Sequence, residues 1–360
     1  MIKALWNEKK IFSGPYPLVG PRLSGQAPFV VDLKKQGVVD TIDTLSIHLG
    51  GNIVTGAGAL GTATGAENPQ GLMVLATLQT APLAAGLIPI NGISSRAAVM
   101  EYAIAEGAFD TLGAIVNAAS STIPIDVWLH FRFKRPGIKK GIDYAHPTDR
   151  WTSDLLTIVF GTVDQLYSGA ATTWDLTGVT VDVYGDLDVN ANPDQIHAVE
   201  IFEQQFNITA ANGAFQINTL PTGCFYDELM IVAELNGALS DAIVYNIEIE
   251  SGGRYWLNLG ETNADFVRQR WTKQAFYDPN GGAHGLTGLY LIPLRDGLWS
   301  RAIDAVGTQL VLKLGVNAPG AGQTFNVRVI GRKLVPGGIK KTIKGAQGTK
   351  TVTGLPVVTP

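Results

Sequence analysis

The segment from Phe29 to Gly51, FVVDLKKQGVVDTIDTLSIHLGG, aligns without a gap with the segment from Phe215 to Gly237, FQINTLPTGCFYDELMIVAELNG. Phenylalanine opens both copies, and glycines coincide at the centre and at the end of each. Each copy predicts a short strand, a glycine turn and a longer strand. In the longer strand of the first copy, polar and apolar residues alternate from Thr44 to Leu49, which is typical of a half-buried strand. The pair indicates an internal duplication, and the alternative is a chance match.

A second pair of matches closes the two halves of the chain. VTVDVYG at 179–185 resembles FNVRVIG at 325–331. Each follows another strand that ends in glycine, LLTIVFG at 155–161 and QLVLKLG at 309–315. Two blocks therefore open alike and close alike in the same order, which favours duplication. The first block carries an insertion of roughly 40 residues, a length that surface loops tolerate.

Composition limits the classes of function. A chain of 360 residues can hold two domains of ordinary size. The formal net charge of -4 gives no general affinity for nucleic acid, so no specific nucleic-acid partner is expected. Charged residues make up 16% of the chain, against about a quarter in typical proteins, and 42 glycines supply many turns. This favours a β-rich protein whose surface is largely covered by copies of itself; the alternative is an ordinary globular protein rich in glycine and alanine.

Alternating apolar residues predict further strands at 72–80, 126–134, 243–250 and 289–294. The main helix of the first block is expected at Ser94–Ala118, capped by Ser94 or Ser95. A short helix is expected in the second block at Asn263–Phe276. In both blocks the helix precedes the strand that comes before the two closing strands, which again favours duplication.

The residue pattern predicts no catalytic residue, no metal ion and no cofactor. The five histidines form no metal-binding pair, and the single cysteine, Cys224, allows neither an internal disulfide nor a thiolate cluster. His48 and His130 fall on the polar faces of predicted strands, where they are expected to be solvated. The chain has no Walker loop and no nucleophile elbow.

Two segments imitate ligand loops without meeting their requirements. Gly56-x-Gly58-x-x-Gly61 follows a strand like a dinucleotide fingerprint, but glycines and an Asn-Pro step prevent the helix that must come next. Residues 186–200 begin like a calcium loop, but Pro193 and Val199 stand where glycine and glutamate are needed. The first segment is expected to be a strand connection and the second a polar link between domains.

Both ends of the chain carry lysines that predict contacts. The start, MIKALWNEKKIF, lacks the apolar core of a secretory signal, and the chain has no run of about 18 apolar residues that would span a membrane. An amphipathic contact with a membrane or a neighbouring subunit is expected to use Lys3, Trp6, Lys9 and Lys10; the alternative is a frayed terminus. Near the other end, a contact with anionic lipid or an acidic neighbour would use Lys340, Lys341 and Lys344. The alternative is a solvated tail.

The predicted fold class is all-β with a few inserted helices, in the form of two tandem eight-stranded jelly-roll barrels. The expected parts are an N-terminal arm (1–27), a first jelly roll (28–187), a linker (188–202), a second jelly roll (203–335) and a basic C-terminal tail (336–360). The tail is expected to be extended or disordered until a partner binds it.

With the openings FVVDLKKQG…LSIHLGG and FQINTLPTG…IVAELNG, the chain resembles double jelly-roll major capsid proteins. These proteins build tailless icosahedral viruses of the adenovirus-like lineage, including bacteriophages with an internal membrane. The resemblance covers about residues 29–335 and rests on architecture and on the order of the repeats. Because such families share little sequence, it transfers no site residue.

The resemblance implies a structural protein of the virion, assembled in the host cytoplasm, rather than an enzyme. It implies homotrimers whose six barrels form pseudo-hexameric capsomers. The expected partners are other copies of the chain, penton and minor capsid proteins, and an internal lipid membrane reached by the termini. Two alternatives are a double β-sandwich carbohydrate-active or glycoamidase-type enzyme and a lectin-like binding module. The enzyme would need clustered carboxylates and aromatic residues in a cleft.

Overall fold

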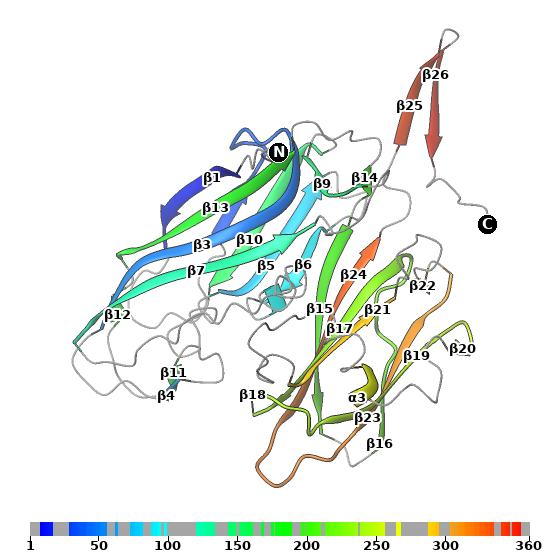
Figure 1. The fold of residues 1–360 in the computed structure, drawn as a ribbon. Coiled ribbons are helices and arrows are strands. Elements are labelled where there is room, and N and C mark those ends of the chain that lie inside the picture. The colour runs from blue at the N-terminus through cyan, green and yellow to red at the C-terminus, as the bar shows by residue number, and fades with distance from the viewer. Residues whose placement is uncertain are drawn as a thin grey trace, which may run out of the picture. The chain divides into compact units, whose positions relative to one another are not determined.

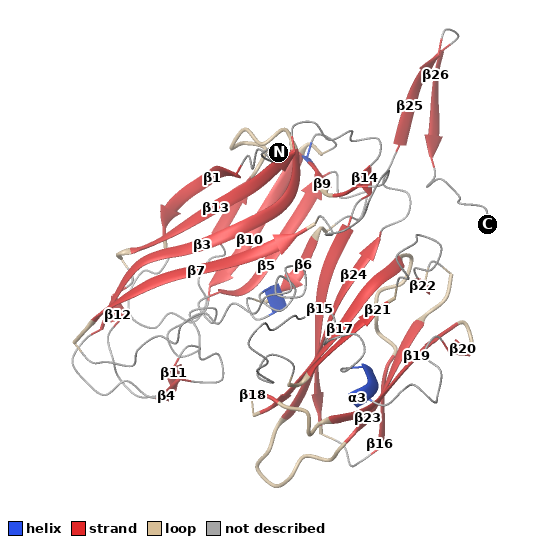
Figure 2. Ribbon diagram, in the orientation of Figure 1, coloured by secondary structure: helices blue, strands red, loops and turns tan. Residues whose placement is uncertain are grey.

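The computed structural model describes residues 8–16, 29–55, 62–63, 73–81, 88–94, 97–98, 120–133, 143–148, 151–160, 167–168, 174–175, 177–188, 196–197, 199–209, 213–236, 238–255, 264–267, 287–294, 303–305, 307–334, 340–345 and 348–353. The chain divides into two compact units. The first comprises Met1–Glu106, Asp110–Gly137 and Asp143–Ile196, and the second comprises Gly107–Phe109, Ile138–Ile142 and His197–Pro360. The described elements are almost all strands (Figure 2). Among them, no helix is long and apolar enough to cross a membrane.

The first unit is a jelly roll made of two antiparallel sheets (Figure 1). One sheet has the order β1 (Glu8–Pro15), β13 (Val179–Asp188), β3 (Thr41–Thr55), β7 (Thr122–Arg132). The other has the order β2 (Phe29–Asp32), β10 (Ser153–Phe160), β5 (Met73–Ala81), β6 (Ile90–Ile93). Counted along the chain, these eight strands lie in the orders 1-8-3-6 and 2-7-4-5, as in a jelly roll. The two-residue strands are β4 (Thr62–Ala63), β8 (Asp143–Tyr144), β9 (His146–Pro147), β11 (Tyr167–Ser168), β12 (Trp174–Asp175) and β14 (Ile196–His197).

The second unit repeats this topology. One sheet has the order β15 (Val199–Ile208), β24 (Phe325–Leu334), β17 (Phe225–Leu235), β21 (Leu289–Pro293). The other has the order β16 (Gly213–Ile217), β23 (Leu310–Val316), β19 (Val244–Ser251), β20 (Arg254–Tyr255). The orders along the chain are again 1-8-3-6 and 2-7-4-5, so the predicted fold class is confirmed. The remaining elements are β18 (Ala238–Leu239), α3 (Ala264–Val267), β22 (Ile303–Asp304), β25 (Lys340–Gly345) and β26 (Gly348–Thr353).

The two aligned segments occupy the same place in the two barrels. The first forms β2 and β3 and the second forms β16 and β17, which are the second and third strands of their barrels. The central glycine of each turn is in the left-handed region, with φ of 78° at Gly37 and 74° at Gly223. Glycine adopts this conformation without the steric cost that a side chain would add. The turn therefore explains why glycine stands at the centre of both copies.

Alternation along the strands decides which side chains form each core. Leu45, Ile47 and Leu49 of β3 are completely buried, and so are Ile231 and Ala233 of β17. Successive side chains of a strand point to opposite faces, so the polar residues between Leu45 and Leu49 face outward. Each fully buried leucine or isoleucine stabilises the fold by about 1.5–3 kcal/mol.

The matched glycines of the closing strands admit a side chain from the first strand of each barrel. A Cβ atom at Gly185 of β13 would lie 2.9 Å from Ile11 Cδ1 of β1. A Cβ atom at Gly331 of β24 would lie only 2.2 Å from Phe202 Cζ of β15. Ile11 is 7% exposed and Phe202 is 2% exposed. The repeated glycine thus makes room for a core side chain of the neighbouring strand.

The structure corrects two of the expected boundaries. Residues Glu8–Pro15 form β1, the first strand of the first barrel, so the prediction of an arm up to residue 27 is wrong there. This short edge strand contributes Ile11 to the core and lacks a long alternating pattern that would reveal it. The expected linker 188–202 is also too long, because β13 ends at Asp188 and β15 begins at Val199.

Of the predicted helices, the glycine loop and the C-terminal tail, the structure describes only parts. The Ser94 hydroxyl accepts a bond from the amide of Ala97 at 3.2 Å, and residues 97–98 are helical, which confirms Ser94 as the cap. The rest of the helix at 94–118 and the glycine loop at 56–61 lie outside the described residues. Within the predicted helix 263–276, the described part is α3. In the C-terminal tail, which the sequence predicts to be extended or disordered, β25 and β26 pair as an antiparallel hairpin.

Candidate interaction surface

A cluster of rings lies on the outward face of the sheet that contains β3, β7 and β13. Strand register places His48 of β3 opposite both Trp128 of β7 and Asp182 of β13. The His48 and Trp128 rings are stacked with centroids 4.2 Å apart, and His130 follows at 5.9 Å from Trp128. Tyr184 lies 5.2 Å from Trp128. We call His48, Trp128, His130 and Tyr184 the ring cluster.

Two carboxylates flank the ring cluster and differ in exposure. Oδ1 of Asp126 accepts a hydrogen bond from Trp128 Nε1 at 3.1 Å and lies 2.9 Å from His48 Nε2, while its side chain is 79% exposed. Asp182 is buried and accepts a bond from the Ser13 hydroxyl at 2.5 Å. It also pairs with Lys10 Nζ at 2.9 Å. Asp182 therefore fastens β1 to β13, whereas Asp126 faces the solvent.

Opposing effects act on the pKa of Asp182. Burial alone would raise it, but hydrogen bonds from Ser13 and Lys10 favour the charged carboxylate and bring the pKa below its ordinary value. The hydrogen bond to Asp182 likewise raises the pKa of Lys10. The ion pair between these residues is therefore present at neutral pH.

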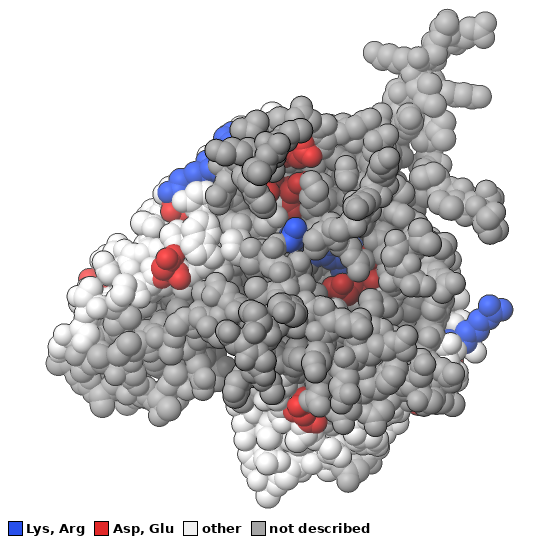
Figure 3. Space-filling view, in the orientation of Figure 1, with Lys and Arg blue, Asp and Glu red and all other residues white. Residues whose placement is uncertain are grey.

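The structure describes some of the predicted contact residues and places them in two strands, β1 and β25. Lys9 and Lys10 lie in β1, and Figure 3 shows basic side chains over this strand. Lys9 is exposed, but Lys10 is held by Asp182 and lies 5.5 Å from the Tyr184 ring centroid. Lys340, Lys341 and Lys344 all belong to β25. Lys3 and Trp6 lie outside the described residues.

Sequence reasoning placed His48 and His130 correctly on a polar face but missed their partners. His130 Nδ1 lies 2.7 Å from the Ser46 hydroxyl, and His48 lies between Asp126 and Asp182. These partners come from strands that are far apart in the sequence. In the sequence, only the alternation of Asp126, Trp128 and His130 along one strand indicates that these side chains lie together on one face.

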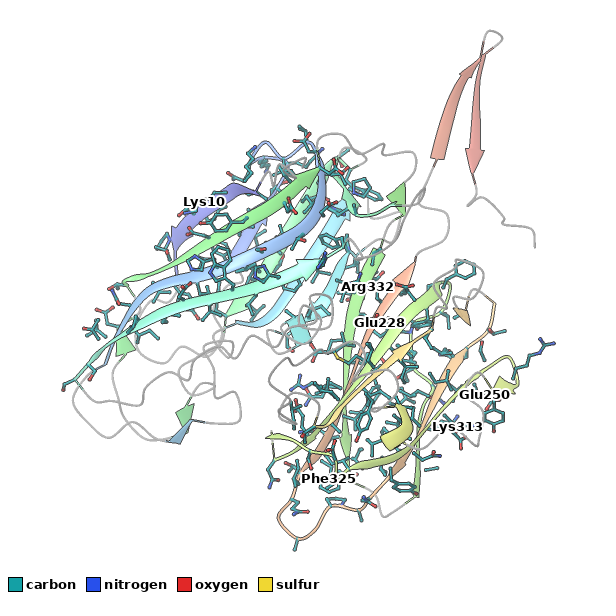
Figure 4. All side chains as sticks on the ribbon, in the orientation of Figure 1. Lys10, Glu228, Glu250, Lys313, Phe325 and Arg332 are labelled. Atoms are coloured by element: carbon teal, nitrogen blue, oxygen red, sulfur yellow. The ribbon has the colours of Figure 1, made fainter. Side chains whose placement is uncertain are left out.

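The equivalent sheet of the second barrel carries buried ion pairs. Arg328 of β24 bridges Glu203 of β15 at 2.7 Å and Glu234 of β17 at 3.1 Å. The register also sets Arg332 opposite Glu228, and both are labelled in Figure 4. Burial lowers the pKa of Arg332 to about 10. These charges lie between strands of one sheet and serve the fold.

The other sheet of the second barrel carries two cationic side chains, a partly exposed Lys313 and an exposed Arg254. Lys313 of β23 pairs with Glu250 of β19 at 2.6 Å, as labelled in Figure 4, and lies 3.3 Å from the Tyr255 hydroxyl. Arg254 follows the Gly252–Gly253 turn and is exposed. Among the described residues, no group of three or more histidine, cysteine, aspartate or glutamate side chains could hold a metal ion.

Comparisons with known proteins locate the fold. No family model matches the sequence, and no curated protein sequence is similar to it. The crystal structure of the STIV major capsid protein (Sulfolobus Turreted Icosahedral Virus) is similar, with a TM-score of 0.65 at 11% identity, over 91% of this chain and 97% of that chain. The major capsid protein P2 from bacteriophage PM2 gives a TM-score of 0.53 at 11% identity, over 90% and 97%. The PBCV-1 virus capsid gives 0.51 at 10% identity, over 93% and 96%.

The structural similarity to the STIV and PM2 proteins extends over at least 90% of this chain and 97% of each of those chains, so it is not a match to a single barrel. The strand orders found in both units account for it. This chain therefore has the double jelly-roll fold, in common with these viral major capsid proteins.

Proposed function

We propose that the chain is the major capsid protein of an icosahedral virus and has a structural rather than a catalytic role. The observation that carries this proposal is the presence of two jelly rolls of one topology in a single chain. Likeness in fold to three viral capsid structures supports it. The low share of charged residues, 16%, suits a protein whose surface is largely covered by its neighbours.

The proposed building block is a homotrimer. Three chains with two barrels each supply six similar barrels, which form a pseudo-hexameric block that can tile a flat facet. Closed cyclic symmetry makes each contact head-to-tail, so a surface of one chain meets a different surface of the next. A chain with a single barrel would need six copies to make the same block.

The proposed partners follow from this role. Capsomers meet one another laterally in the virion, and penton and minor capsid proteins complete the shell after assembly in the host cytoplasm. The lysines of the two ends would contact a lipid membrane beneath the capsid, because each lysine near an anionic surface contributes about 1 kcal/mol. Lys9 and the lysines of β25 are the candidates, and Lys3 and Trp6 extend the N-terminal contact. Lys10 contributes less because Asp182 already holds it.

Mass and shape test the capsid proposal. Purified protein is expected to have three times the chain mass of 38.3 kDa by native mass spectrometry. Negative-stain images are expected to show particles with a hexagonal outline. A stable monomer at micromolar concentration would contradict the proposal, and a monomer that binds or hydrolyses glycans would favour a lectin or a glycan-active enzyme.

Vesicle binding tests the membrane contact separately. Replacement of Lys340, Lys341 and Lys344 with glutamine is expected to weaken co-sedimentation with anionic vesicles and to leave the trimer intact. The control is Lys35→Gln, which removes an exposed lysine of the first barrel. Equal binding of the wild type to anionic and to neutral vesicles would refute the contact.

A further inference from the structure

Asp126 presents an open carboxylate oxygen beside aromatic rings. Within the part of the chain that the structure describes, its contacts with Trp128 Nε1 and His48 Nε2 both involve Oδ1, and the side chain is 79% exposed. These two groups hold the carboxylate through Oδ1, and among the described residues Oδ2 has no partner. Asp126 therefore offers a held acceptor next to a partly exposed indole, an arrangement suited to a guanidinium group that bonds a carboxylate and stacks on a ring.

Two other exposed carboxylates of the described residues lack these features. Asp175 accepts bonds from the Thr177 amide at 2.9 Å and hydroxyl at 2.6 Å, which close its own turn. Asp241 accepts a bond from the Gly288 amide at 2.7 Å. Both carboxylates therefore already accept bonds from backbone amides near turns. Asp126 is thus the better candidate for a partner's cation.

The second barrel carries an exposed cation that could bind the carboxylate of Asp126. Arg254 is exposed, and within the described part of the chain it has no ion-pair partner. It follows Gly252 and Gly253, which have φ of 58° and 75°, so it lies at the tip of a tight hairpin. Its neighbour Lys313 is already paired with Glu250. Lys9 is a second exposed cation without an ion pair in the described residues, but its ammonium cannot make the planar two-point contact of arginine.

We propose that Asp126 and Trp128 receive Arg254 of a second copy of this chain at the contact between neighbouring copies. The proposal rests on the homotrimer proposed above. A head-to-tail ring joins unlike surfaces, so a site on the first barrel and a side chain on the second barrel can meet at every contact of the ring. A carboxylate held by a tryptophan and an arginine at a hairpin tip supply opposite charges and a ring for that contact.

Charge reversal tests the pairing. Asp126→Arg and Arg254→Asp are each expected to raise the dissociation constant of the trimer about tenfold, measured by sedimentation velocity over a dilution series. The double variant restores the pair with its charges exchanged and is expected to return to within about threefold of the wild type. Asp126→Asn keeps the size of the side chain and removes only its charge, so it is expected to give a smaller effect in the same direction.

Matched controls separate this contact from general charge effects. Asp175→Arg and Lys9→Asp reverse exposed charges on the first barrel and are expected to leave the trimer unchanged. Restoration in the double variant would also show that Asp126→Arg still folds. The pairing would be overturned if both single reversals kept the dissociation constant of the wild-type trimer. It would also be overturned if the double variant were weakened by the product of the two single effects. In either case the proposed trimer itself would remain supported. A monomeric wild type would instead overturn the proposed function itself.

Discussion

Substitution of Gly331 by alanine is expected to destabilise the second barrel, whereas the same change at Gly185 is expected to be nearly neutral. The two glycines hold matching positions in the last strands of the two barrels. A Cβ atom at Gly331 would lie 2.2 Å from Cζ and 2.3 Å from Cε1 of Phe202, and 3.1 Å from Leu229 Cδ2. The Phe202 ring is buried, so it cannot turn away without disturbing its neighbours.

The change in the free energy of unfolding is the sum of two opposing contributions. Overpacking of a core costs about 1–3 kcal/mol, and replacing glycine in a strand recovers about 0.5–1 kcal/mol of backbone entropy. Because the Phe202 ring is rigid, the overpacking cost should lie near the upper end of this range, so Gly331→Ala should lower the free energy of unfolding by about 2 kcal/mol. At Gly185 the nearest atoms are Ile11 Cδ1 at 2.9 Å and Leu187 Cδ2 at 3.2 Å, which are the ends of flexible side chains. There the two contributions should cancel to within about 0.5 kcal/mol.

Urea unfolding of the full chain, with hydrogen exchange to assign each transition to a barrel, measures both effects. Combining Gly331→Ala with Phe202→Leu makes room for the new methyl group. The double variant is therefore expected to be more stable than the sum of the two single losses predicts. A Gly331→Ala protein that unfolds at the wild-type urea concentration, or equal losses at the two glycines, would refute this account of the repeated glycine.

Three further outcomes are expected. Asp182→Asn should destabilise the first barrel at pH 7. A carboxylate with a lowered pKa stabilises the fold only while it is charged, so the difference in stability between this variant and the wild type should shrink in acid unfolding as the pH falls below 3.8. Arg328→Met should cost about 3 kcal/mol in urea unfolding, because Glu203 and Glu234 lose the guanidinium that bridges them, and adding Glu234→Gln should recover part of that loss. Cys224 is 1% exposed, so its reaction with a thiol reagent should be slower than in urea by on the order of a hundredfold, and rapid labelling of the native protein would contradict the packing of the second barrel.

The amino-acid sequence by itself determined the fold class and the correspondence of the two barrels. Alternation between Thr44 and Leu49 identifies a half-buried strand because the side chains of a strand have a period of two. The glycines at 37 and 223 identify the same turn because both need a positive φ. Such signals are local, since each depends on residues a few positions apart. They therefore survive in a sequence that matches no family model.

Only the tertiary structure decided where the barrels begin and which surface residues meet. β1 is recognisable once it pairs with β13, which follows far along the chain, because a short edge strand has little pattern of its own. His48, Trp128 and Asp182 come together because β3 lies between β7 and β13. Hydrophobic alternation states which face of a strand is buried but not which strands are its neighbours. The polar outward face, and any contact made on it, therefore follows from the pairing of distant strands.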